Sequence, residues 1–132
     1  MLFRSGRRVP LDPLYVQECG SCHAPFPPAL LPAESWQRLL GGLRKHFGTD
    51  ASLEPAAQEA LGRWLTANAT TRRIEAPAED RITRTRWFQR EHDEVPADAW
   101  RRPAVKNAAN CAACHPAAAE GGYSERQVRI PR

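Results

Sequence analysis

The sequence contains the string Cys-Xaa-Xaa-Cys-His twice, and the two copies use all four cysteines of the chain. The first copy runs from Cys19 to His23 and the second from Cys111 to His115. This pattern is typical of covalent haem attachment, in which the two thiols add across the vinyl groups of one haem and the histidine coordinates its iron. The sequence therefore predicts two covalently attached haem c groups, held by Cys19, Cys22, Cys111 and Cys114.

Three other uses of paired cysteines explain the pattern less well. Four cysteines in two pairs could close a zinc site, but such sites rarely place a histidine directly after both second cysteines. A thioredoxin-like dithiol needs a βαβ context, and the chain offers no convincing strands. Two structural disulfides would leave His23 and His115 without a role. Haem attachment accounts for both the cysteines and the histidines.

The histidine count indicates how the two irons are ligated. Two six-coordinate irons need four axial ligands, and the chain has four histidines. Its only methionine is Met1, so the His/Met ligation of many monohaem cytochromes c would have to use a terminal residue. We predict bis-histidine ligation of both irons, with proximal His23 and His115 and distal His46 and His92.

Other roles for the two distal histidines stay open. A lone histidine on an apolar face is more often a core residue than a ligand, and a deprotonated lysine could also bind iron. We expect local pairing, His23 with His46 and His92 with His115, although crossed pairing would also satisfy the count. A polar, threonine- and alanine-rich connection over residues 68–79 is the expected boundary between an N-terminal haem-binding half, residues 1–70, and a C-terminal half, residues 71–132, within one compact unit.

The small size of the chain indicates what its core is made of. Its 132 residues leave about 66 for each haem, too few for a stable core of side chains alone. We expect a mostly α, cytochrome c-like fold of short helices and long loops wrapped around two haems, since proline and glycine number 12 and 8. The net charge of +4 comes without the basic, aromatic-interleaved runs of nucleic-acid binders, and it suits a docking face for a redox partner.

Local signals place the first attachment motif and the first distal histidine on helices. Asp12 as N-cap and Pro13 at the first helical position predict a helix that ends at Cys19. An apolar stripe predicts an amphipathic helix over residues 32–47, with His46 on its apolar face. Gly41-Gly42 carries a propensity cost inside that helix.

Three further helices are expected after the first distal histidine. Ser52 is predicted to cap a helix that runs through Leu65, and a helix over residues 81–91 is expected to end just before His92. An alanine-rich helix over residues 104–115 would carry the second motif. No segment is long and apolar enough to span a bilayer.

The start of the chain carries no secretory signal, because residues 1–10 are basic and lack an apolar stretch. Haem c is nevertheless normally attached outside the bacterial cytoplasm. We therefore expect a periplasmic protein from which a signal segment has been removed.

The sequence resembles the small dihaem cytochrome c family across nearly its whole length. The resemblance rests on both attachment motifs, the proline-rich residues 27–32, His46-Phe47-Gly48, Trp87-Phe88 with His92, and Ile130-Pro131. It implies a periplasmic electron carrier with bis-histidine haems, in which His46 and His92 match the distal positions. It also implies an oxygen-binding monohaem cytochrome as electron acceptor and a membrane b-type cytochrome as donor.

Together these features predict a one-electron carrier and not an enzyme, because filled axial positions leave no site for a substrate on iron. The alternative is a haem enzyme or gas-binding protein in which His46 or His92 is displaceable. A third possibility is a structural domain of a larger redox complex, in which the haems contribute mainly stability.

Overall fold

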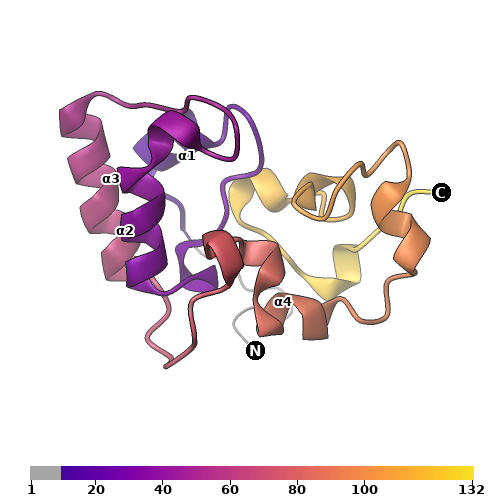
Figure 1. Ribbon diagram of the computed structural model, residues 1–132. Helices are drawn as coiled ribbons and strands as arrows, with labels where there is room; N and C mark the ends of the chain where they lie inside the picture. Colours follow the sequence, from indigo (N-terminus) through magenta and orange to yellow (C-terminus); the bar gives the residue numbers. More distant parts are fainter. Residues whose placement is uncertain (1–9) are drawn as a thin grey trace. The chain divides into compact units, whose positions relative to one another are not determined.

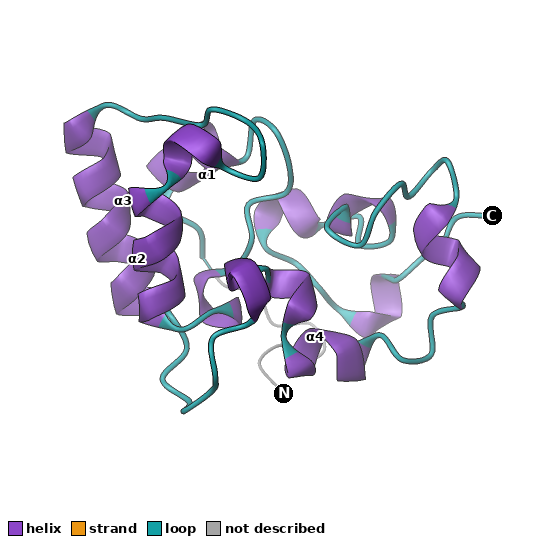
Figure 2. Cartoon of the chain, in the orientation of Figure 1, coloured by secondary structure: helices purple, strands orange, loops and turns teal. Residues whose placement is uncertain are grey.

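The computed structural model describes residues 10–132, and this part of the chain is mostly helical (Figure 1). It contains α1 (Pro13–Cys19), α2 (Ala33–Gly41), α3 (Pro55–Asn68) and α4 (Arg86–Glu91). The 3-10 turns are Pro28–Leu30, Leu43–Lys45, Ala78–Asp80, Ile82–Arg84, Ala97–Arg101, Cys111–Ala113, Ala118–Glu120 and Glu125–Gln127. Between these elements Figure 2 shows only loops. The predicted mostly α fold of short helices and long loops is confirmed.

Contacts between protein atoms divide the described chain into two compact units. One is continuous and spans Pro28–Thr85, and the other combines the residues up to Pro27 with Arg86–Arg132. The expected haem-binding halves, 1–70 and 71–132, are defined by the cofactor and not by protein contacts. They therefore stay a prediction.

The core of the Pro28–Thr85 unit lies where α2 and α3 run side by side (Figure 1). The indole nitrogen of Trp36 donates a hydrogen bond of 2.8 Å to the carbonyl of Pro28, and Gln58 Nε2 donates one of 2.7 Å to the carbonyl of Leu40. These bonds satisfy polar groups next to the buried apolar side chains. The buried hydrophobic side chains of this core are Leu30, Leu31, Trp36, Leu40, Leu61, Leu65 and Ile82.

The other unit has little regular structure around its core. Its helices α1 and α4 have only 7 and 6 residues, and most of Arg86–Arg132 consists of turns and loops. The buried apolar side chains of this unit are Tyr15, Phe88, Ala99, Val105, Ala117 and Ala118. Most of them are small, so protein atoms alone give this unit a modest apolar core.

The helix expected over residues 32–47 is shorter in the structure. α2 ends at Gly41, and the N–H of Gly42 closes the last turn on the carbonyl of Leu39 at 3.2 Å. The glycine pair lowers helix propensity enough to end the helix here. His46 is consequently extended (φ −78°, ψ 90°) and does not lie on a helix face, so that expectation was wrong.

The two helices that follow begin later than expected. α3 starts at Pro55, whose fixed φ suits the first helical position, and the predicted Ser52 cap was wrong. The Ser52 N–H instead donates to Asp50 Oδ1 at 2.9 Å in an Asx turn. α4 starts at Arg86 and not at residue 81, because Thr85 is extended and its hydroxyl donates to the carbonyl of Ile82 at 2.8 Å.

The alanine-rich helix expected over residues 104–115 is absent from the described structure. Lys106 has φ 74°, Asn107 Oδ1 accepts a 2.9 Å bond from the N–H of Ala109, and Asn110 Nδ2 donates to the carbonyl of Val105 at 2.8 Å. These asparagine side chains bond to the backbone in competition with helical hydrogen bonds. Only the 3-10 turn Cys111–Ala113 remains helical.

Candidate functional site

The first attachment motif begins at the last residue of α1. Asp12 Oδ1 accepts hydrogen bonds from the N–H groups of Leu14 and Tyr15 at 2.8 and 3.4 Å, so the predicted N-cap is confirmed. Gly20 then closes the helix through a 2.9 Å bond from its N–H to the carbonyl of Val16. A Cβ atom at position 20 would collide with that carbonyl oxygen, so glycine suits this position of the motif.

His23 lies in the loop that follows, with its ring oriented by two neighbours. Nδ1 donates to the carbonyl of Ala24 at 2.8 Å, and the ring stacks on Phe26 with centroids 4.7 Å apart. In this tautomer Nε2 carries the lone pair that a metal would use. The buried Tyr15 donates a 2.5 Å hydrogen bond from its hydroxyl to the carbonyl of Phe26, which ties α1 to the His23 loop.

The second attachment motif is built from turns. The N–H of His115 donates to the carbonyl of Cys111 at 2.8 Å, and the N–H of Arg129 donates to the carbonyl of Cys114 at 2.9 Å. The ring centroid of Tyr123 lies 5.0 Å from that of His115. Tyr123 and Arg129, both C-terminal to the motif, therefore contact it at two places.

The chemistry of the thiols argues against the other uses of these cysteines. As free thiols, Cys19 and Cys111 have a pKa that burial raises to about 11 each. Such thiols stay protonated at neutral pH and are poor nucleophiles, unlike those of a reactive dithiol. Within residues 10–132, no three histidine, cysteine or acidic side chains gather as a zinc site would require.

His92 follows α4 directly and is oriented by the residues of that helix. Its Nδ1 donates to the carbonyl of Phe88 at 2.7 Å, and the two rings stack at 4.0 Å with an interplanar angle of 21°. The ring of Trp100 lies 5.9 Å away on another side. The hydrogen bond places the proton on Nδ1 and the lone pair on Nε2.

His92 and His115 lie together in one unit. Their ring centroids are 6.3 Å apart and their planes are nearly perpendicular, at 82°. Two imidazoles bound to opposite sides of one metal by bonds of about 2 Å have ring centres roughly 6 Å apart. Burial, and secondarily the neighbouring His92, lower the pKa of His115, which favours the neutral ring that metals bind. The separation of the two rings therefore matches that of two imidazoles on one iron.

His46 belongs to the other unit, in the tight turn that follows α2. Its N–H donates to the carbonyl of Thr49 at 2.8 Å, and the N–H of Thr49 returns a bond of 3.1 Å. The ring is half-buried and lines a cavity of about 460 Å³ together with Arg38, Lys45, Phe47 and Arg81. His23 lies in the unit of the attachment motifs, so the expected pairing of His23 with His46 stays a prediction.

Comparison with known families gives a specific match. The dihaem cytochrome c family matches residues 15–123, a range that includes both attachment motifs and both predicted distal histidines. The chain belongs to the dihaem cytochrome c family.

Three solved structures resemble this dihaem cytochrome c over nearly their whole length. The diheme cytochrome c of Shewanella baltica OS155 is 35% identical, with a TM-score of 0.80, 93% of this chain covered and 95% of that one. Two structures from Rhodobacter sphaeroides are 37% and 39% identical, with TM-scores of 0.78 and 0.71. They cover 89% and 87% of this chain and all of theirs. A comparison with curated proteins found no match.

Family membership establishes the cofactors that the motifs predicted. The dihaem cytochrome carries two covalently bound haem c groups. Among its described residues no helix has the length and apolar character that a membrane crossing requires.

Sequence analysis missed Tyr123 as a neighbour of the second motif. This residue follows His115 by eight positions in a glycine-rich tail, where no periodicity indicates which side chains turn inward. An aromatic residue directly after Gly121-Gly122 was the one available signal, since glycine pairs mark a tight turn that redirects the chain. The contact between Arg38 and Asp80, beside the His46 turn, was also not predicted. The two residues lie 42 positions apart in the sequence, and no local pattern relates them.

Proposed function

We propose that this dihaem cytochrome c is a one-electron carrier of the periplasm. The observation that best supports the proposal is the His92–His115 pair, whose 6.3 Å separation suits two axial ligands on one iron. An iron ligated on both faces by the protein offers no position to a substrate, which favours electron transfer over catalysis.

The proposed attachment sites are the two motifs, with Cys19 and Cys22 holding one haem and Cys111 and Cys114 the other. His115 and His92 would ligate the second iron. His23 and His46 would ligate the first, on the argument that two irons need four ligands and the chain has four histidines. The family resemblance supports the same assignment.

The protein controls the environment in which each haem supplies a reversible one-electron iron couple. The carbonyl of Phe88 holds the proton of His92 on Nδ1, and the carbonyl of Ala24 does the same for His23. These hydrogen bonds orient the rings and raise their basicity as ligands. The stacked rings of Phe88 and Phe26 shield the same imidazoles from water on one face.

The compartment and the partners follow from chemistry and from the family resemblance. Attachment of haem c outside the bacterial cytoplasm supports a periplasmic location. The resemblance supports an oxygen-binding monohaem cytochrome as acceptor and a membrane b-type cytochrome as donor. Docking with such partners would be transient, with charge setting mainly the encounter rate.

The proposal is tested by optical and low-temperature EPR spectra of the dihaem holoprotein, oxidised and then reduced with dithionite, before and after addition of carbon monoxide. Two low-spin irons that do not bind carbon monoxide are expected. A high-spin ferric signal, or a reduced band that shifts with the gas, would reveal an open iron. That result would favour a haem enzyme or gas-binding protein instead.

A further inference from the structure

Two strained turns lie at the cavity that His46 lines. Phe47 and Gly48 have φ values of 50° and 89°, in a tight turn closed by the backbone bonds between His46 and Thr49. Glu79 and Asp80 have φ values of 56° and 55°. A bulky residue at positive φ persists only where the surrounding contacts hold it. Of the four non-glycine residues at positive φ in residues 10–132, three line this cavity.

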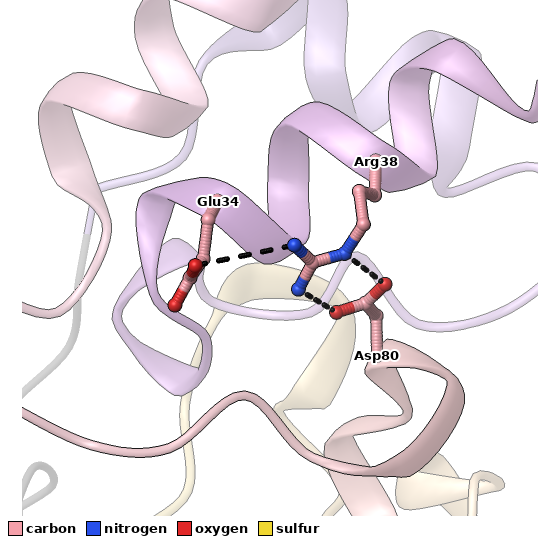
Figure 3. A network of polar contacts seen from close by, with 3 residues as sticks. All are labelled: Glu34, Arg38 and Asp80. Atoms are coloured by element: carbon pink, nitrogen blue, oxygen red, sulfur yellow. Dashed lines mark hydrogen bonds and ion pairs between the residues drawn. The ribbon is translucent and has the colours of Figure 1, made fainter.

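An ion pair holds the turn at Asp80 against α2. Arg38 Nε donates to one carboxylate oxygen of Asp80 at 2.9 Å and Arg38 Nη2 donates to the other at 2.7 Å, as Figure 3 shows. Ser35, one turn before Arg38 on α2, is fully buried, so this end of the helix is packed into the unit. The Asp80 side chain is only 13% exposed, whereas that of Arg38 is 52% exposed, so water reaches the guanidinium more easily than the carboxylate.

A second arginine connects the Asp80 turn to the His46 turn. The guanidinium carbon of Arg81 lies 4.4 Å from the centre of the Phe47 ring, at cation–π distance. The Phe47 ring is in turn 4.9 Å from the ring of His46. A series of contacts and chain bonds therefore connects α2 to His46 through Asp80, Arg81 and Phe47. Phe47 is exposed and has a positive φ, so we expect its position to depend on these contacts.

We propose that Arg38 and Asp80 are positioning residues for His46. By fixing the turn that contains Arg81, the ion pair holds Phe47 and so limits movement of the His46 ring. The inference rests on the proposed function, in which His46 is an axial ligand of one haem. A helix-anchored ion pair would thereby control how often this ligand leaves its iron, without touching the iron itself.

The test measures carbon monoxide binding by the reduced dihaem holoprotein after substitution of either partner. Asp80→Asn and Arg38→Gln each remove the charge pair, and both are expected to bind carbon monoxide at one iron. The unmodified protein is expected to bind none, so the expected change is from no carbon monoxide binding to binding at one of the two irons. The double variant should bind no more carbon monoxide than either single variant, since the two side chains act through one contact.

A matched control is the ion pair between Arg63 and Glu59 on α3. Its 2.7 Å distance equals that of Arg38 and Asp80, it belongs to the same unit, and it does not line the cavity. Arg63→Gln is expected to leave the protein inert to carbon monoxide. Arg38→Lys is a milder variant that keeps the charge but loses the fork geometry, and it decides the question if Asp80→Asn does not fold.

His46→Ala separates the two possible failures. If His46→Ala binds carbon monoxide while the Asp80 and Arg38 variants stay as inert as Arg63→Gln, the positioning proposal is overturned and the ligand assignment stands. If the Asp80 variant has a lower melting temperature but binds no carbon monoxide, the positioning proposal is likewise overturned, because the ion pair then serves stability alone. If His46→Ala itself stays inert, both the ligand assignment and the positioning proposal are overturned.

Discussion

The imidazole ring of His92 stands edge-on to the ring of His115, at 6.3 Å between centroids and 82° between planes. The two residues both belong to the segment Arg86–Arg132, where His92 follows α4 directly and His115 lies in a turn. Their facing arrangement brings a distal and a proximal candidate together within one unit. It also sets the relative orientation of the two ring planes, which is a spectroscopic observable in a ferric haem.

The orientation of these rings predicts the EPR spectrum of the oxidised holoprotein. Nearly perpendicular imidazole planes leave the two iron dπ orbitals close in energy, which produces a strongly anisotropic low-spin signal with one large g value. We expect one of the two haems to show this signal in frozen solution. Two ordinary rhombic low-spin signals, with none of the anisotropic kind, would contradict the perpendicular arrangement.

Replacing His92 by alanine is expected to open one iron. The variant should bind one carbon monoxide per two haems after reduction, whereas the unmodified protein should bind none. Gas titration followed by optical spectroscopy measures this stoichiometry. Trp100→Phe is a suitable control, because it alters a ring next to His92 and leaves the imidazole intact. A fully inert His92→Ala protein would show that His92 is not a ligand.

Tyr15→Phe should destabilise the unit of the attachment motifs. The substitution removes the hydroxyl that donates to the carbonyl of Phe26 and leaves a part-buried acceptor without its donor. The expected loss in the free energy of unfolding is about 1–2 kcal/mol. Guanidinium denaturation of the holoprotein, followed by circular dichroism, measures it. Val16→Ala, on the exposed side of the same helix, should change stability by less than about 0.5 kcal/mol. Equal effects of the two substitutions would count against this role of the hydroxyl.

The Arg38–Asp80 pair predicts a dependence of stability on pH. The hydrogen bond from Arg38 is the main reason why the pKa of Asp80 lies below its ordinary value, which is about 3.9. A carboxylate with a depressed pKa in the folded state contributes its stability in full above the unfolded pKa. That stability is lost as the pH falls through the folded pKa.

The difference in unfolding free energy between the unmodified protein and Asp80→Asn should therefore be constant from pH 7 to about pH 5. It should shrink below about pH 4, as Asp80 takes up a proton. Urea midpoints measured across this range test the expectation. Asp98→Asn is the comparison: Arg102 also lowers the pKa of Asp98, but the Asp98 side chain is 65% exposed, so the change with pH should be smaller. A difference that does not change with pH would contradict the assignment to Asp80.

The parts of the fold that follow from local rules were predicted from the sequence. Asp12 and Pro13 indicate a helix start that any tertiary context would permit, and α1 begins there. The mostly α class and the two haems also follow from the sequence, because the spacing of the attachment motifs is specific. The motif histidines and their cysteines needed no three-dimensional information to be singled out.

The errors arose where glycines or competing side chains oppose the helical backbone. The stripe over residues 32–47 is apolar at helical spacing, yet Gly41-Gly42 ends α2 and places His46 in a turn. The alanines of residues 104–115 favour a helix, but the side chains of Asn107 and Asn110 bond to the backbone instead. The contact of Arg38 with Asp80 could not be predicted, because nothing local relates residues so distant in the chain.

The unit that contains both attachment motifs is interrupted in the chain by the whole of Pro28–Thr85. In any process that delivers the polypeptide from its N-terminus, Cys19 and Cys22 emerge long before Arg86–Arg132, which completes their surroundings. The enclosed segment, by contrast, holds all of its own core and closes shorter loops. The order of emergence therefore leaves the Cys19 and Cys22 thiols accessible for haem attachment before the residues that complete their unit have emerged.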